Sequence, residues 1–511
     1  MSNIKIKRAL VSVFEKDGLD EVIKCLHRHD VELVSTGGTQ AFINKMGIDC
    51  TAVEDLTSYP SILGGRVKTL HPSIFGGILT RRDNPDDKNQ CEMYDILPID
   101  LVIVDLYPFV NTVKGGGTQE EIIEKIDIGG VSLIRAAAKN HKDVVIISSK
   151  DGYPELVKLL DAQNGETTLA QRLSFAQTAF AVTSQYDTAI FNYFSGKSLE
   201  GRASGLILSF EKSESLRYGE NPHQKGEFFG DIRARFDFIQ GKQLSYNNLL
   251  DVDTAVHLVE EFESPTCAIL KHNTPCGLAS KDSALEAYKT ALACDPISAF
   301  GGIIVINREV DGAVAEEIDK LFFEVLIAPG YTQDALDIFG KKEKRIILLD
   351  KLGSDHSTHT YRTILGGLLA QERDTRIETK ADLKVVTNNA PTTTEIEDML
   401  FAMKVVKYCK SNAIVIAKDG RMLGAGYGQT SRVDALRQAI EKAKVMGFDL
   451  QGAVLASDAF FPFADCVEIA DKAGIKAFIQ PGGSIKDQLS IDYCNEHDLA
   501  MCFTGIRHFR H

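Results

Sequence analysis

The first 150 residues alternate between short apolar runs and amphipathic runs, and this alternation constrains the fold more than any other feature. The runs RALVSVF, ELVST, DLVIVDLYPF and DVVIISS are strand-like, whereas LDEVIKCLHRH, TQAFINKMG and TQEEIIEKI are helix-like. Thr118 and Glu121 fit a capping box at the start of one helix. Strands that alternate with helices predict an α/β fold with a parallel sheet and crossover helices. In such a sheet, neighbouring strand ends form one crevice where ligands bind.

The rest of the chain predicts a second region of similar type. A long helical pattern, TTLAQRLSFAQTAFAVTSQYDTAIFNYF, precedes the linker-like stretch SGKSLEGRASG. We therefore place the main boundary near residue 200, between regions 1–199 and 200–511. The second region opens with the strand-like run LILSF, and a polar stretch at 373–394 is expected to divide it into two lobes. The second lobe holds a hairpin with an Asp-Gly turn in AIVIAKDGRMLGAG and a helix from about Ser431 to Gly447.

Composition and charge exclude several classes of protein. A chain of 511 residues has room for roughly three domains of about 150 residues. Its net charge of -14 argues against a bulk binder of nucleic acid or anionic membranes. No run of about eighteen apolar residues occurs, and the N-terminus lacks the apolar core of a signal peptide. The ten cysteines are scattered without a C-x-x-C pair, so we expect a reduced, cytoplasmic protein with most cysteines buried.

The first region carries a candidate phosphate loop. VSTGGT, at 34–39, ends a strand and opens a helix, so its glycines, backbone N–H groups and hydroxyls suit a phosphate monoester. A tight strand-to-helix turn explains these residues equally well. Ser12 and Lys16 end the preceding strand run and favour the binding interpretation, because neighbouring strand ends share a crevice.

Three further segments of the first region hold candidate functional side chains. GGRVKTLHP, at 64–72, gathers cations, a hydroxyl and a histidine, which favours a binding loop over a solvated basic loop. Tyr107 follows a buried strand, where it could equally be a packed aromatic residue. Asp127 precedes a Gly-Gly break, and Arg135 and Lys139 lie four residues apart. On a helix this spacing stacks two like charges, which is sensible when they face an anion.

In the second region, the segment AILKHNTPCG runs from an apolar strand into Lys271 and His272. If the strand continued, these two side chains would point to opposite faces. We therefore predict that a loop turns both into one cleft, with the turn at Thr274-Pro275 and Cys276-Gly277.

Four more segments of the second region are rich in groups that could hold a phosphate or a heterocycle. They are LRYGENPHQ, CDPISAFGG, KYCKSNAIVIA with Asn412, and SDAFFPFAD. The aromatic run of the last segment is more typical of a core, although its proline and flanking acids favour a loop.

A zinc site is a competing interpretation. His272, Pro275 and Cys276 echo the zinc deaminases, but the H-x-E start and the P-C-x-x-C close of that signature are missing. The pair His356 and His359 lies in a polar loop without a third ligand nearby, so we expect it to be solvated. We predict no metal.

Taken together, the motifs resemble one enzyme family. VSVFEK, STGGT, LGGRVKTLHP, DLYPF, IDIGGVSLIRAAAKNH, LRYGENPHQ, LKHNTPCG, SDAFFPF and FTGIRHFRH all occur, in order, in the bifunctional purine-biosynthesis enzymes that join AICAR transformylase to IMP cyclohydrolase. The chain departs from the family at Thr274, where relatives often carry asparagine, and it is short around 341–366.

The resemblance implies a fold, an activity and partners. It implies a Rossmann-like, methylglyoxal-synthase-like first domain and two cytidine-deaminase-like α/β lobes without zinc. The second region would transfer a formyl group from the co-substrate 10-formyltetrahydrofolate to AICAR, and the first would close formyl-AICAR to IMP. The enzyme would be a cytoplasmic homodimer with its transformylase site across the interface, and would bind neither nucleic acid nor membrane. A phosphate-sensing regulatory module and a zinc deaminase are the alternatives.

The resemblance also assigns residues. For formyl transfer, His272 would be the base, Lys271 a proton donor or electrostatic stabiliser, and Asn412 an orienting group. For cyclisation, the matched residues are Lys68, Tyr107, Asp127 and Lys139, with Thr69 nearby. The phosphate of the cyclisation substrate would meet Ser12, Lys16, Ser35, Thr36, Gly38, Thr39 and Arg66. The transformylase nucleotide would meet Arg217, Tyr218, Gly301, Glu324, Arg507 and the segment 508–511, and the folate would meet Arg432, Phe461, Pro462 and Phe463.

Overall fold

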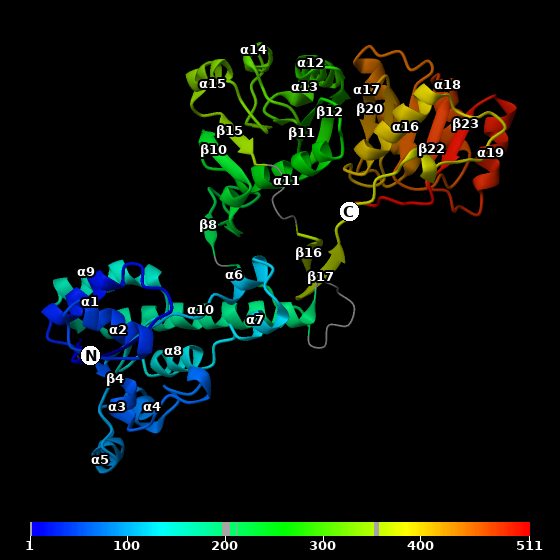
Figure 1. Cartoon of the computed structure of the whole chain (residues 1–511). Helices are drawn as coiled ribbons and strands as arrows, with labels where there is room; N and C mark the ends of the chain where they lie inside the picture. Colours follow the sequence, from blue (N-terminus) through cyan, green and yellow to red (C-terminus); the bar gives the residue numbers. More distant parts are fainter. Residues whose placement is uncertain (1–2, 197–204, 211, 352–356) are drawn as a thin grey trace. The chain divides into compact units, whose positions relative to one another are not determined.

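The computed structural model describes residues 3–196, 205–210, 212–351 and 357–511. The chain divides into two compact units, Met1–Glu211 and Lys212–His511, and each is described by itself (Figure 1). The predicted linker falls largely in 197–204, outside the described residues, so the boundary near residue 200 stays a prediction. His356 also lies outside them.

The first unit is built on a parallel sheet, as predicted. Its five strands have the order β4-β3-β2-β5-β6, and every neighbouring pair is parallel. The strands are β2 (Arg8–Ser12), β3 (Glu32–Ser35), β4 (Thr51–Ala52), β5 (Leu101–Val104) and β6 (Val145–Ile147). All four residues of β5 and all three of β6 are buried, as expected for strands covered by helices on both faces.

Helices surround this sheet. They are α1 (Leu19–Arg28), α2 (Gly37–Lys45), α3 (Val53–Thr57), α4 (Pro72–Leu79), α5 (Pro85–Met93), α6 (Phe109–Lys114), α7 (Gln119–Ile123), α8 (Gly129–Lys139), α9 (Tyr153–Ala162) and α10 (Leu169–Ser195). Thr118 caps α7 with Glu121 in the predicted capping box. A small antiparallel pair, β1 (Ile4–Lys5) with β7 (Glu166–Thr167), completes the unit. No described helix of either unit has the length and apolar character needed to cross a membrane.

The second unit contains one large mixed sheet of twelve strands. Their order is β10-β15-β14-β13-β11-β12-β20-β19-β21-β22-β23-β18. The strands are β10 (Phe236–Gln240), β11 (Thr266–Lys271), β12 (Thr274–Ser280), β13 (Ile303–Ile306), β14 (Val325–Ala328), β15 (Ile346–Asp350), β18 (Lys384–Val385), β19 (Ile414–Lys418), β20 (Arg421–Gly426), β21 (Val454–Ser457), β22 (Ala477–Gln480) and β23 (Ala500–Phe503). The two halves of the sheet join between β12 and β20 through the pair Ala279 and Arg421.

Three apolar cores hold this sheet between helices. One core spans both halves and includes α11 (Tyr246–Glu260) and α16 (Thr393–Val406). Two separate cores pack residues of one half each. The other helices of the unit are α12 (Ala284–Cys294), α13 (Pro296–Ala299), α14 (Gly312–Asp319), α15 (Gln333–Phe339), α17 (Arg432–Val445), α18 (Asp465–Lys472) and α19 (Asp487–Glu496). Two small hairpins, β8 (Ser213–Ser215) with β9 (Glu227–Phe229) and β16 (His359–Ile364) with β17 (Gly367–Glu372), lie outside the large sheet.

Two predictions about local structure are wrong. The run LILSF, at 206–210, is not a strand, because it has no partner strand and all but one of its residues are exposed. His359 is not solvated: it lies in β16 and is buried, with its Nδ1 2.9 Å from the Thr358 hydroxyl. The prediction that most cysteines are buried is confirmed, since only Cys50 and Cys91 are not fully buried.

Candidate active sites

The first candidate site lies where β2 and β3 end. Ser12, the last residue of β2, has its hydroxyl oxygen 2.9 Å from that of Thr36, which precedes α2. The Thr39 hydroxyl donates to the Val13 carbonyl oxygen at 3.0 Å, and the Ser35 hydroxyl donates to that of Val11 at 2.6 Å. A Cβ atom at Gly38 would meet no other residue, so the loop faces open space. The hydroxyls of Ser12 and Thr36 and the N-terminus of α2 therefore lie together at these strand ends, and phosphate binding there stays a prediction.

Two half-buried charged side chains, Lys16 and Asp105, lie beside this loop. The Lys16 ammonium donates to the Val13 and Phe14 carbonyl oxygens, the latter at 3.2 Å. Burial lowers the pKa of Lys16; the Asp105 carboxylate opposes this, and the nearby Lys68 ammonium adds to it. Asp105 accepts from the backbone N–H groups of Phe14 and Glu15, the latter at 2.8 Å. Sequence reasoning missed Asp105, although its position directly after β5 was a signal.

Tyr107 and Asp127 form a second group in the same unit. Asp127 is buried, which raises the pKa of its carboxyl group, and the N–H of Gly130 donates to it at 2.6 Å. The pKa of Tyr107 is raised by burial and by the negative charges of Asp127 and Asp105. These two groups therefore lie within electrostatic reach of each other. Thr69 is buried, and its hydroxyl closely approaches Gly129 at the start of α8.

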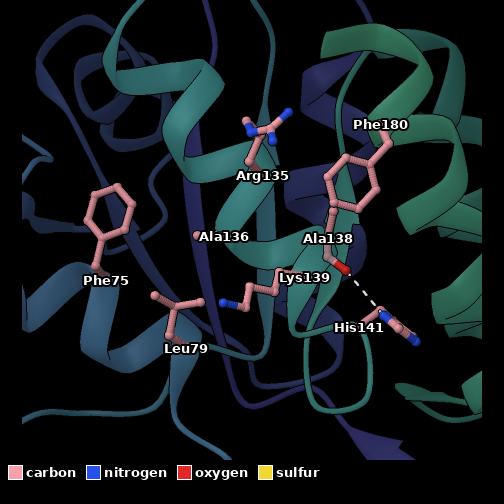
Figure 2. A pocket seen from close by; sticks show the side chains of 8 residues that line it. All are labelled: Phe75, Leu79, Arg135, Ala136, Ala138, Lys139, His141 and Phe180. Carbon is pink, nitrogen blue, oxygen red and sulfur yellow. Dashed lines mark hydrogen bonds between the residues drawn. The ribbon is translucent and has the colours of Figure 1, made fainter. Parts of the chain in front are cut away.

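Lys139 is not part of this group, contrary to the prediction. Asp127 lies just before α8 and Lys139 is its last residue, so about 15 Å of helix separates them. Lys139 instead lines a hollow of about 530 Å³ together with Phe75, Leu79, Arg135, Ala136, Ala138, His141 and Phe180 (Figure 2). In this hollow the Arg135 guanidinium lies 5.7 Å from the centre of the Phe180 ring. The Arg66 guanidinium, which was predicted to bind the phosphate, forms an exposed ion pair with Glu124.

The second candidate site is the hairpin of β11 and β12. Its two-residue turn is His272-Asn273, with φ angles of 53° and 61°. The turn predicted at Thr274-Pro275 and Cys276-Gly277 is wrong, because those residues belong to β12. The strand tolerates Pro275 because the pairing register shifts between Ile269 and Leu270, opposite this proline.

Lys271 and His272 have different neighbours. The Lys271 ammonium donates to the Phe300 carbonyl oxygen at 2.6 Å. His272 is exposed in the turn and lies close enough to Asp251 of α11 for its charge to affect that carboxyl group. These contacts do not show the two groups converging on one point. The Lys271 ammonium is held on the side of the loop after α13.

Asn412 is held by the residues around α17. Its side-chain oxygen accepts from the Arg432 guanidinium at 2.8 Å, and its amide donates to the Gln429 carbonyl oxygen at 3.0 Å. Arg432 is buried, forms an ion pair with buried Asp458 and donates to the Ser457 hydroxyl at 2.8 Å. The guanidinium predicted to face the folate is thus bound to Asp458, Ser457 and Asn412, although Arg432 also lines the hollow beside Asn412.

A hollow of about 440 Å³ opens beside Asn412. The residues that line it include Arg432, Phe460, Pro462, Phe463, Asp465 and Phe509. Phe461 is absent from this lining, contrary to the prediction: it is fully buried, with its ring 6.5 Å from that of Phe478. Its neighbour Phe460, which the sequence analysis passed over, faces the hollow instead. In an irregular loop, adjacent aromatic side chains point in different directions, and composition alone does not tell them apart.

Two of the remaining predicted nucleotide contacts, Gly301 and Glu324, lie close together, because the Glu324 N–H donates to the Gly302 carbonyl oxygen at 3.0 Å. The Arg217 guanidinium lies 5.5 Å from the centre of the Tyr218 ring, and that of Arg507 lies 4.4 Å from the centre of the Phe509 ring. Glu324 accepts from Asn248 at 3.1 Å, and the Gly301 N–H donates to the Phe322 carbonyl oxygen at 2.7 Å with a left-handed φ of 71°.

His508 is not available to a nucleotide, contrary to the prediction. It is buried, and its two ring nitrogens lie 2.6 Å from Asp374 and 2.7 Å from Glu378. Burial alone would lower the pKa of His508, but the two carboxylates outweigh it and raise this pKa to about 9. The imidazole is a structural tie between the C-terminal segment and residues 374–378.

The zinc interpretation rested on His272 and Cys276, and neither belongs to a group of three possible metal ligands among the described residues. The one cluster of three possible ligands within the described residues is Cys25, His29 and Asp161, in the first unit. There the Arg28 guanidinium already binds Asp161 at 3.0 Å.

Two α/β units, each with its own group of ionisable side chains beside a crevice or hollow, define a two-site enzyme that acts on small molecules. The chain matches the family described as AICARFT/IMPCHase bienzyme over residues 137–442, and an MGS-like domain over residues 18–132. This chain therefore belongs to the AICARFT/IMPCHase bienzyme family, and its first unit is MGS-like.

Curated relatives match along their whole length. The bifunctional purine biosynthesis protein PurH of Bacteroides thetaiotaomicron is 59% identical over 507 residues, which cover 99% of both chains. The PurH of Rhodospirillum rubrum is 47% identical over 100% of both chains. That of Aquifex aeolicus is 48% identical over 99% of this chain and 100% of its own. The predicted likeness of the second unit to cytidine deaminases stays a prediction.

Proposed function

We propose that this chain catalyses two consecutive reactions of purine biosynthesis: formyl transfer to AICAR, and closure of formyl-AICAR to IMP. The observation that carries this proposal is the end-to-end match with relatives named as bifunctional PurH, at up to 59% identity. A regulatory module would need only the phosphate loop of the first unit. The second unit, with its His272 turn and its hollow beside Asn412, is additional machinery that such a module does not require.

Formyl transfer belongs to the second unit. The 5-amino nitrogen of AICAR attacks the formyl carbon of 10-formyltetrahydrofolate, the bond from that carbon to the folate nitrogen breaks, and tetrahydrofolate leaves. The amine is a poor nucleophile because its lone pair is delocalised into the ring, so removal of its proton during attack helps. His272, exposed in its turn, is the proposed base. The departing folate nitrogen takes up a proton, for which Lys271 is the proposed donor or electrostatic stabiliser.

The hollow beside Asn412 suits the folate. Phe460, Pro462 and Phe463 offer apolar surface for a flat heterocycle, while Asn412 offers an oriented amide. The formyl carbonyl oxygen gains negative charge during attack, and the amide N–H of Asn412 is the proposed orienting group for it. The nucleotide is assigned to Arg217, Tyr218, Gly301, Glu324 and Arg507.

Cyclisation belongs to the first unit. The carboxamide nitrogen of formyl-AICAR attacks the formyl carbon, the nitrogen atoms lose protons, and the formyl oxygen leaves as water. Tyr107, Asp127 and Lys68 are the proposed proton-transfer and charge-stabilising groups. Lys139 lies outside this group in the structure and is given no step. The substrate phosphate would meet the strand-end crevice, through Ser12, Lys16, Ser35, Thr36, Gly38, Thr39 and Arg66.

The proposal is tested by supplying purified protein with AICAR and 10-formyltetrahydrofolate. Release of tetrahydrofolate and IMP in equal amounts is expected. Binding of a phosphorylated nucleotide without turnover would support the sensing module instead. Zinc-dependent release of ammonia from AICAR would support a deaminase.

We also propose that the enzyme is a cytoplasmic homodimer with its transformylase site across the subunit interface. The hairpin β16–β17 supports this, because Leu365 is fully exposed and Leu369 is 56% exposed. A two-stranded hairpin is marginal on its own in water, and exposed apolar residues of this kind mark contact surfaces. Ten free cysteines fit a reducing compartment.

The dimer is tested by light scattering on a sizing column. The wild type is expected at twice the chain mass. Leu365→Asp with Leu369→Asp should give monomers that lose formyl transfer and keep cyclisation, whereas Thr363→Asp on the same hairpin should leave the dimer intact. A wild type that elutes as an active monomer would contradict the proposal.

A further inference from the structure

We infer that Asp251 and Thr254, on one side of α11, are positioning residues that hold the His272-Asn273 turn in its working conformation. Neither residue stood out in the sequence. The inference rests on the proposed role of His272 as the base of formyl transfer. It adds the groups that fix the place from which this base acts.

The first anchor is the Asp251 carboxylate. It accepts a hydrogen bond from the backbone N–H of Asn273, and the backbone N–H of His272 also reaches it. Burial raises the pKa of Asp251, while these N–H groups and the His272 imidazole oppose the rise; Glu324 is the other nearby acid. A carboxylate that bonds both N–H groups of a two-residue turn fixes the backbone from which His272 projects.

The second anchor is the Thr254 hydroxyl, three residues further along α11. It donates to the side-chain oxygen of Asn273 and accepts from the Arg510 guanidinium at 2.7 Å. Arg510 is itself held, because its guanidinium donates to the Tyr408 carbonyl oxygen at 3.1 Å and its backbone N–H donates to the Ser411 hydroxyl at 3.0 Å. A continuous chain of hydrogen bonds thus joins the turn to the residue that precedes Asn412.

The turn needs such anchors because of its backbone. Both of its residues, His272 and Asn273, have left-handed φ angles. A non-glycine residue pays roughly 1–2 kcal/mol for this conformation, which persists where surrounding contacts over-determine it. His272 is exposed, so packing around its ring contributes little to holding this conformation.

Capping of α11 does not explain these contacts. The helix begins after Ser245, and Ser245 with Asn248 already forms its capping box. Asp251 lies a turn further into the helix, where its own backbone N–H is bonded within the helix. Its carboxylate therefore serves the turn of the hairpin rather than the end of its helix.

Five single variants test the inference. Asp251→Ala removes the acceptor, and Asp251→Asn keeps an acceptor oxygen without the charge. Thr254→Val removes the hydroxyl at constant shape, and Thr254→Ser restores it. Asp253→Asn, which removes the charge of an acid on the same helix that pairs with His257 and Arg373 rather than with the turn, is the matched control.

Formyl transfer and AICAR binding are measured for each variant, with cyclisation of supplied formyl-AICAR as an internal control. A misplaced base should slow chemistry more than binding, so Asp251→Ala is expected to lower kcat about 100-fold with KM for AICAR within about threefold. Asp251→Asn should recover to within about fivefold of wild type. Thr254→Val should lower kcat about tenfold, whereas Thr254→Ser and Asp253→Asn should stay within about twofold.

Failure of the inference is distinguishable from failure of the proposed function. A wild type without formyl transfer, or a fully active His272→Ala, would remove the proposed function. If the wild type is active and His272→Ala is not, an unimpaired Asp251→Ala overturns the positioning role. The positioning role is also overturned if kcat of Asp251→Asn is as low as that of Asp251→Ala, or if kcat of Thr254→Ser is as low as that of Thr254→Val. If Asp251→Ala fails to fold, the two threonine variants decide the question alone.

Discussion

At the residue scale, neighbours within one motif have opposite roles. Phe460 is 38% exposed and lines the hollow beside Asn412, whereas Phe461 is fully buried in the core. The sequence indicated an aromatic loop here, and Pro462 and Phe463, which were predicted to meet the folate, line this hollow. The sequence could not predict which phenylalanine is exposed and which is buried, because the direction of each side chain depends on the backbone path of an irregular loop.

We predict opposite effects for Phe460→Ala and Phe461→Ala. The first should raise KM for the formyl folate about tenfold and leave the melting temperature unchanged, because it removes stacking surface from an open hollow. The second should destabilise the second unit by about 3–5 kcal/mol, because it leaves a cavity in a close-packed core. Steady-state kinetics and thermal unfolding separate them. Equal effects of both variants on KM would contradict this assignment.

Lys16 carries a second prediction at this scale. Burial and the Lys68 ammonium lower the pKa of Lys16, so the cation that would meet the substrate phosphate is lost at lower pH than an ordinary lysine. In wild type, kcat/KM for cyclisation of formyl-AICAR should therefore fall on the alkaline side below the usual pKa of lysine. Lys16→Gln should have a several-fold higher KM and lack this fall. Lys24→Gln, on the exposed face of α1, is the control. If kcat/KM of Lys16→Gln still falls at alkaline pH, another group causes the fall and the prediction is contradicted.

At the scale of elements, the sequence pattern predicted the alternating strands and helices of the first unit but not the turn of the β11–β12 hairpin. Strands buried on both faces alternate with amphipathic helices, and that periodicity is a local signal. The β11–β12 turn uses His272 and Asn273 in left-handed conformations, whereas the residues that usually mark turns, Pro275 and Gly277, lie within β12. Gly277 is needed there because a Cβ would clash with the Ala291 carbonyl oxygen of α12, a contact that no local pattern reveals.

The C-terminal segment gives a prediction at the scale of elements. The pKa of His508 is raised to about 9 from an ordinary value of 6.5 by Asp374 and Glu378. A raised pKa stabilises the fold fully below about pH 6.5, and this contribution is lost as the pH rises through about 9. The shift corresponds to a contribution on the order of 3 kcal/mol. His508→Gln should therefore be less stable than wild type at pH 6.5.

Thermal unfolding at several pH values checks this prediction. The gap between wild type and His508→Gln should narrow from pH 6.5 to above pH 9. A gap that stays constant over this range would show that the tie does not depend on the charge of the imidazole.

At the scale of the whole molecule, the motifs that hold the candidate residues Ser12, Thr36, Asp127, His272 and Asn412 were visible in the sequence, while the residues that support them were not. Asp105, Asp251 and Arg510 reach their partners over 90, 22 and 256 residues of sequence respectively, and only the folded chain brings them together. Sequence proximity is also a poor guide for Lys139, because Lys139 lies at the end of α8 that is far from Asp127.

The central claim is that two separate sites, one in each unit, perform consecutive reactions. The most direct test is to measure both activities of His272→Ala, using AICAR with formyl folate for one and supplied formyl-AICAR for the other. We expect tetrahydrofolate release to fall at least about 100-fold, as for loss of a general base, while IMP formation from formyl-AICAR stays within about twofold of wild type. Loss of both activities in a folded variant, or an undiminished release of tetrahydrofolate, would contradict the account.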